Sequence, residues 1–136
     1  MKRYFLIIAI LIFTLTSCST DDDTPSFYFE ILPIESAEMP EQFVFGETYE
    51  IFIDYIRPTD CHVFNDFLYQ KNGQERTVGI INTVYTDNIC LVLEENVTVS
   101  FQFNVTSYET YIFKFYQGED EEGFDQYLII EVPVVV

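Results

Sequence analysis

The segment 97–105 alternates strictly between apolar and polar residues, and this period of two constrains the fold more than any other feature of the sequence. It reads Val-Thr-Val-Ser-Phe-Gln-Phe-Asn-Val. Successive side chains of an extended strand point to opposite faces, so the pattern gives one apolar and one polar face. A helix would scatter the same apolar side chains around its whole circumference. The segment therefore predicts a strand with one buried and one solvated face.

Similar patterns recur along the chain, separated by turn residues. Clear alternation is found at 49–55, 111–115 and 128–134, and weaker strand patterns at 27–34, 42–45, 62–70 and 77–86. Asn72-Gly73 is a strong signal for a two-residue hairpin turn. Further turns are expected at 46–47, 58–60, 87–88, 94–96 and 118–125. No window shows helical periodicity, so the pattern predicts an all-β chain.

The number and spacing of these segments predict the architecture. About seven strands in a domain over 26–136 favour a single immunoglobulin-like antiparallel β-sandwich. A small closed barrel is the alternative, and the uneven strand lengths favour the sandwich. Pro133 removes a backbone donor, so the last segment is expected to lie at a sheet edge.

The first 17 residues have the pattern of a cleaved export signal. Lys2 and Arg3 precede an apolar run from Tyr4 to Leu15. This run is too short for a bilayer core, which needs about 20 helical residues. Leu15-Thr16-Ser17-Cys18 closes the run and resembles the lipobox of a bacterial lipoprotein. The resemblance implies cleavage before Cys18, a diacylglycerol on its sulfur and an acyl chain on its new amino group.

The next residues, 18–25, are polar, acidic and end in Pro25, which is typical of a flexible tether. Their acidic run, Asp21-Asp22-Asp23, resembles the export signal of surface-exposed lipoproteins of Bacteroidota-type bacteria. That resemblance implies an outer-membrane lipoprotein that faces the cell exterior, and a periplasm-facing lipoprotein with an ordinary linker is the alternative. The chain thus divides into a signal peptide (1–17), a lipidated cysteine with its tether (18–25) and a β-sandwich domain (26–136).

Two cysteines, Cys61 and Cys90, remain in the predicted domain. An even pair in an oxidising compartment favours a disulfide, and two free buried thiols are the alternative. A structural zinc site is less favoured, because Cys61-His62 and Cys90 offer no fourth ligand and no paired spacing.

The charge of the chain limits its partners. Without residues 1–17 the chain keeps 4 basic residues against 23 acidic ones, a formal charge of −19. Such a surface repels phosphate backbones and anionic lipid headgroups, so nucleic-acid binding is not expected. Cationic ligands, basic protein patches and Ca²⁺ remain compatible with it.

The densest acidic cluster lies in the turn predicted near the C-terminus. Its carboxylates belong to Glu119, Asp120, Glu121, Glu122 and Asp125. Hard oxygen ligands suit Ca²⁺, so a weak calcium site is one interpretation, although the spacing does not match an EF-hand loop. The other interpretation is a solvated hairpin tip.

No motif for catalysis or cofactor binding is found. His62 is the single histidine, it lies in or beside a predicted strand, and no glycine-rich nucleophile turn surrounds any serine. We therefore expect a surface or edge-strand role for His62 and no catalytic activity. The five glycines are isolated and form no phosphate-binding loop, so no cofactor is expected.

Tyrosines on predicted outer faces or strand ends offer a ligand platform, because their rings stack on sugars and anchor protein interfaces. They are Tyr28, Tyr69, Tyr85, Tyr108, Tyr116 and Tyr127. The leading hypothesis is a lipid-anchored accessory or binding module with a protein or glycan partner. A structural or assembly subunit of an envelope complex is the alternative, and a small hydrolase is a remote one.

Overall fold

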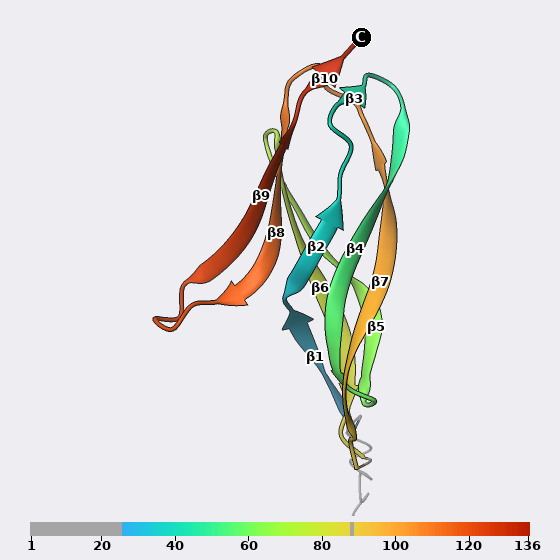
Figure 1. Ribbon diagram of the computed structural model, residues 1–136, viewed down its shortest axis with the longest axis vertical. Coiled ribbons are helices and arrows are strands. Elements are labelled where there is room, and N and C mark those ends of the chain that lie inside the picture. Colours follow the sequence, from blue (N-terminus) through green and yellow to red (C-terminus); the bar gives the residue numbers. More distant parts are fainter. Residues whose placement is uncertain (1–25, 88) are drawn as a thin grey trace, which may run out of the picture.

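The computed structural model describes residues 26–87 and 89–136, and these form ten strands with no helix (Figure 1). The all-β prediction is confirmed. Within these residues, nothing helical is long and apolar enough to span a membrane. The strands are β1 (Phe27–Leu32), β2 (Ile34–Glu38), β3 (Phe43–Val44), β4 (Thr48–Thr59), β5 (His62–Asn72), β6 (Glu75–Tyr85), β7 (Val92–Asn104), β8 (Tyr111–Glu119), β9 (Asp125–Val132) and β10 (Val134–Val135).

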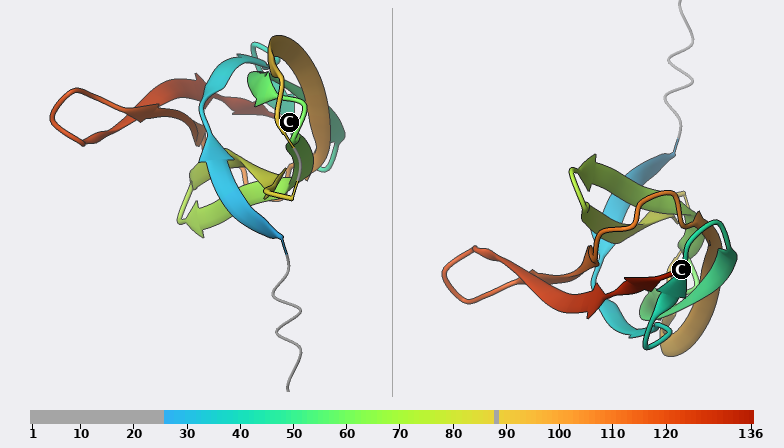
Figure 2. Two further views of the ribbon diagram at one scale, coloured as in Figure 1. Left: turned by 90° about the horizontal axis from the view of Figure 1, so that it is seen from below. Right: turned by 90° about the horizontal axis from the view of Figure 1, so that it is seen from above.

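These strands form two packed layers and a small third sheet. A five-stranded sheet contains β1, β5, β6, β8 and β9, and a three-stranded sheet has the order β2-β4-β7. The two layers face each other in a sandwich-like arrangement, and the β8–β9 hairpin extends to one side of the body (Figure 2). β3 and β10 pair near the C-terminal end of the molecule (Figure 1).

Two strand pairs depart from the predicted antiparallel pattern. β6 and β8 are parallel, as are β3 and β10, whereas the other pairs among the described residues are antiparallel. The β6–β8 pair is parallel because β7 lies between them in the chain and returns through the opposite sheet. β8 therefore runs in the same direction as β6. It pairs with the first part of β6, from Glu75 to Val78, whereas β1 pairs with the second part, from Ile80 to Tyr85.

Pro33 and Pro133 each divide one predicted strand into two, which is part of the reason why the ten strands outnumber the predicted seven. The segment 27–34, predicted as one strand, is divided there: β1 pairs with β6 in one sheet, and β2 pairs with β4 in the other. Proline has no backbone donor and cannot continue a ladder, so the chain changes sheets at this residue. Pro133 separates β9 from β10 in the same way, and β9 lies at a sheet edge as predicted.

Turn predictions were confirmed at some positions and not at others: β4 continues through Pro58 to Thr59, so the turn predicted at 58–60 begins only at Asp60. The Asn72-Gly73 hairpin connects β5 to β6, and residues 120–124 connect β8 to β9. The turn expected at 94–96 is wrong as a strand break, because β7 continues through it opposite β4, although Glu94 has φ +48° where the ladder shifts register. Glu95 pairs with Arg57 across these strands at 2.7 Å, which favours the extended backbone there.

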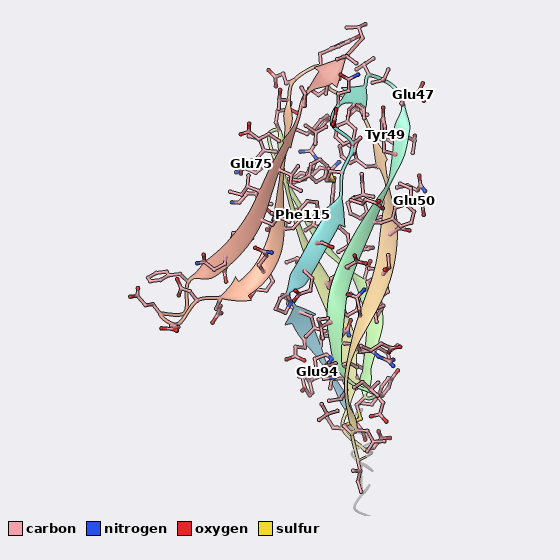
Figure 3. The ribbon with its side chains drawn as sticks, viewed as in Figure 1. Glu47, Tyr49, Glu50, Glu75, Glu94 and Phe115 are labelled. Atoms are coloured by element: carbon pink, nitrogen blue, oxygen red, sulfur yellow. A yellow bond between two sulfur atoms is a disulfide. The ribbon has the colours of Figure 1, made fainter. Side chains whose placement is uncertain are left out.

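The core between the layers is rich in aromatic rings. Phe103 lies 5.0 Å from Tyr111 and 5.1 Å from Phe113, with the rings nearly perpendicular, a favourable arrangement for aromatic pairs. Figure 3 shows Phe115 between the layers, whereas Glu50 projects from the outer face of β4. The alternation seen in the sequence therefore separates the buried from the solvated faces.

Cys61 and Cys90 form the predicted disulfide, with their Cα atoms 5.5 Å apart. Cys61 lies where the chain crosses from β4 to β5, and Cys90 lies where it crosses back from β6 to β7. The bond therefore joins the two connections between the sheets at one end of the molecule. It also removes both thiolates that a zinc site would need.

Gly118 allows a test of how Pro33 fits against β8. Its φ is +90°, and an added Cβ would lie 3.3 Å from Cγ of Pro33. Gly123 has a similar φ of +86°, with open space around it. We expect Gly123→Ala to lower the free energy of unfolding by about 1–2 kcal/mol through backbone strain alone. Gly118→Ala should cost about 1 kcal/mol more, because Pro33 must also move. Urea unfolding of both variants measures the difference, and equal costs would mean that the Pro33 contact contributes nothing.

Candidate ligand-binding cleft

A cleft of about 540 Å³ lies where the sandwich is open between β5 and β7. Both are edge strands, each of a different sheet. Ring contacts connect the two edges: Phe101 of β7 lies 5.2 Å from Phe67 and 5.9 Å from Tyr69 of β5, measured between ring centroids. A cleft of this volume is within the usual range for small-molecule sites.

The alternation along β5 and the β5–β6 register determine which side chains face the cleft. Phe67, Tyr69 and Lys71 share one face of β5 because side chains two residues apart point the same way. Lys71 is the register partner of Arg76 on β6, so both basic side chains lie at this opening. The polar lining also includes the following residues of β5, β7 and the loop after it: Asp66, Gln102, Asn104 and Thr106.

Arg76 is the most unusual residue of the cleft, because its side chain is only 8% exposed. Its Nη1 donates to the carbonyl oxygens of Gly73 and Glu75, each at 2.8 Å, and its guanidinium lies 5.1 Å from the ring centroid of Tyr111. Nε has no hydrogen-bond partner, and neither of the two ion pairs among the described residues includes Arg76. A buried cation is normally paired with a carboxylate.

Lys71 and Arg76 form a like-charge pair in direct cross-strand register. Such a pair destabilises a sheet, whereas an acidic partner would stabilise it. Acidic residues outnumber basic ones in this chain by 23 to 6, so a carboxylate at either position would be more usual than a second positive charge. The two positive charges therefore lie side by side at an opening whose lining also includes the carboxylate of Asp66.

Burial and Arg76 affect the pKa values of Tyr69, which lines the cleft, and of Tyr111, which lies against the guanidinium of Arg76. Burial raises the pKa of Tyr69, and the positive charge of Arg76 opposes this only in part. Burial also raises the pKa of Tyr111, but hydrogen bonds from Thr106 and Ser107 outweigh it and lower the pKa overall. Both backbone N–H groups donate to the Tyr111 oxygen, at 3.1 and 2.9 Å. They hold the ring that supports the guanidinium.

The predicted tyrosine platform is only partly realised. Tyr28, Tyr69, Tyr85 and Tyr108 are exposed, but they lie on different parts of the molecule. Tyr69 alone among the six predicted tyrosines lines the cleft, while Tyr108 stacks on Phe45 at 3.9 Å. Tyr116 and Tyr127 are half-buried and pair across the β8–β9 hairpin at 6.0 Å. The six residues therefore form no common surface.

His62 is buried, contrary to the expected surface position, although its strand β5 is an edge strand as expected. Its Nε2 lies 2.7 Å from a carboxylate oxygen of Glu30, and its Nδ1 lies 2.7 Å from the hydroxyl of Thr59. The same hydroxyl accepts the backbone N–H of Cys61 at 3.2 Å. The ring thus connects β1 to the end of β4, and the arrangement fits a structural role.

The acidic loop is organised by its own backbone rather than around a shared centre. Oδ1 of Asp120 accepts the N–H groups of Glu122 and Phe124, at 2.9 and 3.0 Å. Its other oxygen accepts the side-chain amide of Gln126 at 3.2 Å. Among the described residues, the one group of three potential metal ligands within 4.8 Å of one another is Asp60, Cys61 and Cys90, elsewhere in the fold. Both sulfurs there are in the disulfide, so that group lacks thiolate ligands.

We expect Ca²⁺ to stabilise the protein no more than NaCl does at equal ionic strength. The carboxylates of the acidic loop are exposed, and salt screens their repulsion whatever the cation. A specific site would add about 2.7 kcal/mol at a hundredfold excess over its Kd. Thermal melts in millimolar CaCl₂ and in matched NaCl distinguish the two cases, and a larger shift with Ca²⁺ would establish the calcium site.

Several residues that carry the sequence interpretation lie outside the described part of the chain. Cys18 and the acidic run Asp21-Asp22-Asp23 belong to this group. Lipidation and the tether therefore remain predictions from the sequence. A comparison with protein-family models, curated proteins and solved structures found no match for this chain.

Proposed function

We propose that this protein is a lipid-anchored, non-enzymatic binding module of the outer membrane, facing the cell exterior, whose cleft binds a glycan that carries an acidic group. The observation that supports the binding role is the Lys71 and Arg76 pair at an aromatic-lined opening, where neither residue belongs to an ion pair among the described residues. The lipobox at Cys18 and the acidic tether support the location.

A glycan fits the chemistry of the cleft in two respects. The rings of Phe67, Tyr69 and Phe101 provide apolar faces of the kind that stack on sugar rings. Gln102, Asn104 and Thr106 provide amide and hydroxyl groups for sugar hydroxyls. An acidic sugar would complete the set with a carboxylate for Lys71 and Arg76. The net charge of −19 acts weakly on it, because distant carboxylates are screened beyond about 8 Å at physiological salt.

A protein partner is the second candidate, and the two free strand edges favour it. β5 and β7 each have one edge without a hydrogen-bonded neighbour among the described strands. An extended segment of a partner could pair with either edge while placing a side chain in the cleft. Two experiments distinguish the candidates: binding on an array of acidic and neutral glycans would support a glycan, and capture in a pull-down of surface proteins would support a protein partner. Binding to neither would contradict the proposed binding function.

Cys18→Ala is expected to release the protein from the membrane into soluble fractions. A single acyl chain anchors only marginally, and the variant would have none, whereas the lipidated protein has two or more. Cell fractionation measures this, and membrane retention of the variant would contradict the lipobox interpretation.

Replacing Asp21, Asp22 and Asp23 by alanine tests orientation separately: the protein should change from protease-accessible on intact cells to protected. Unchanged accessibility would mean that the run is only a spacer.

A further inference from the structure

One end of the domain carries exposed apolar side chains from three chain segments. We call this surface the apolar tip, and it consists of Phe27, Tyr85, Ile89, Leu91 and Val92. Ile89, Leu91 and Val92 are 92%, 64% and 76% exposed, respectively. The tip lies at the lower end of Figure 1, opposite the C-terminus.

The apolar tip is held in place by several bonds. Phe27 is the register partner of Tyr85, and the N–H of Thr86 donates to the carbonyl oxygen of Ser26 at 2.7 Å. Leu91 exchanges two hydrogen bonds with Asp60: its N–H donates to the carboxylate, and its carbonyl accepts the Asp60 N–H. The Cys61–Cys90 disulfide connects the same segments. These bonds join the three segments to one another. A contiguous exposed apolar surface is typical of a protein or membrane interaction site.

The chain enters the domain at this same end, which limits what can cover it. β1 begins at Phe27, nine residues after Cys18. Nine residues span at most about 30 Å when fully extended. The apolar tip is therefore the end of the domain that stays close to any bilayer holding lipids on Cys18.

We propose that the apolar tip inserts into the interface of the bilayer that holds the lipid anchor, where zwitterionic phospholipid covers its side chains. This inference rests on the anchoring part of the proposed function. Apolar side chains at such an interface lie about 5–10 Å into the boundary between headgroups and acyl chains. The tip would then add a second attachment to the acyl chains and hold the domain upright.

The charges around the tip select the kind of lipid. Asp60 and Asp87 flank it, both exposed, and the domain as a whole is strongly acidic. Anionic headgroups would repel these carboxylates, whereas zwitterionic headgroups carry no net charge. The proposed occupant is therefore a zwitterionic bilayer surface.

An upright domain places the cleft away from the membrane. β7 runs from Val92 at the tip to Phe101 at the cleft, nine residues further along. At about 3.3 Å per residue this separates them by about 30 Å. The cleft would then be presented beyond the lipid headgroups to a partner outside.

A single tryptophan tests the proposal, because the chain contains none. The lipidated full chain with Val92→Trp is reconstituted into phosphatidylcholine vesicles whose acyl chains carry bromine, a short-range quencher. Val136→Trp, at the fully exposed opposite end, is the matched control. We expect the Val92→Trp emission to shift to shorter wavelength and to lose most of its intensity. Val136→Trp should keep the emission of a water-exposed indole, and phosphatidylglycerol in the vesicles should reduce the Val92→Trp quenching.

The outcomes separate this inference from the anchor on which it rests. Co-flotation of the protein with the vesicles, together with unquenched Val92→Trp, would overturn the inference and leave the anchor intact. Failure of the wild-type protein to co-float would overturn the anchor and the inference together. A blue shift without quenching that grows with protein density would overturn the lipid assignment in favour of a second copy of the chain.

Discussion

Replacing Cys61 and Cys90 together by serine is expected to lower the free energy of unfolding by about 3–4 kcal/mol. The two residues are separated by 29 positions, and the bond closes this loop in the unfolded chain as well as in the native one. Losing that constraint increases the conformational entropy of the unfolded state. A domain of this size has a total stability of only about 5–15 kcal/mol, so the change is a large fraction of it.

The position of the bond argues for the upper part of this range. It joins two of the places where the chain crosses between the sheets, β4 to β5 and β6 to β7. Reducing the wild-type protein should reproduce the cost in urea unfolding, while the double-serine variant should not respond to reductant. Two thiols that titrate in the native wild-type protein would contradict the bond itself.

Much of the strand pattern followed from local sequence. The alternation at 97–105 predicted a strand because every odd position is apolar and every even position is polar. β7 contains nearly all of this segment. The Asn72-Gly73 hairpin was predictable because its turn chemistry is local. Cys61 and Cys90 were predictable as a pair because no other cysteines were available in the domain.

Other features depend on contacts that a sequence pattern does not contain. Within the turn expected at 94–96, Glu94 has a left-handed backbone with φ +48°, but Glu95 and Asn96 are extended because they pair with β4 from more than 30 residues away. The change of sheet at Pro33 could have been anticipated, because a proline inside a predicted strand argues against one continuous ladder. The parallel β6–β8 pair follows from the route of β7 through the opposite sheet, which periodicity alone does not specify.

The candidate cleft was missed for the same reason. It combines β5 with β7, whose nearest lining residues are about 30 positions apart in sequence. A local signal for part of it did exist: Lys71 and Arg76 flank the Asn72-Gly73 turn, so a hairpin places them opposite each other. Two of the few basic residues, in register across a predicted turn, would have marked this opening as basic. Tyr69 was predicted as a ligand-platform residue, and it does line the cleft.

Arg76→Gln is expected to weaken binding of an acidic glycan by about 10- to 100-fold. A hydrogen bond to a charged group contributes about 1.5–3 kcal/mol, and 1.4 kcal/mol corresponds to a factor of ten. Lys71→Gln should cost only a few-fold, because its side chain is exposed and its charge is screened. Both changes remove the like-charge pair, so Lys71→Gln should leave the stability unchanged or slightly higher.

Matched variants make this prediction specific to the cleft. Lys114→Gln removes a basic residue on β8 that lies over the ring of Tyr127 and outside the cleft, so it should not change the affinity. Arg76→Lys keeps the charge and should retain part of the binding. A neutral analogue of the same glycan has no acidic group to interact with the Arg76 guanidinium. It should therefore bind the wild type and Arg76→Gln with similar affinity. Titration calorimetry with both glycans measures these differences. Equal losses for Arg76→Gln and Lys114→Gln would show that general electrostatics, rather than the buried guanidinium of the cleft, determines the affinity.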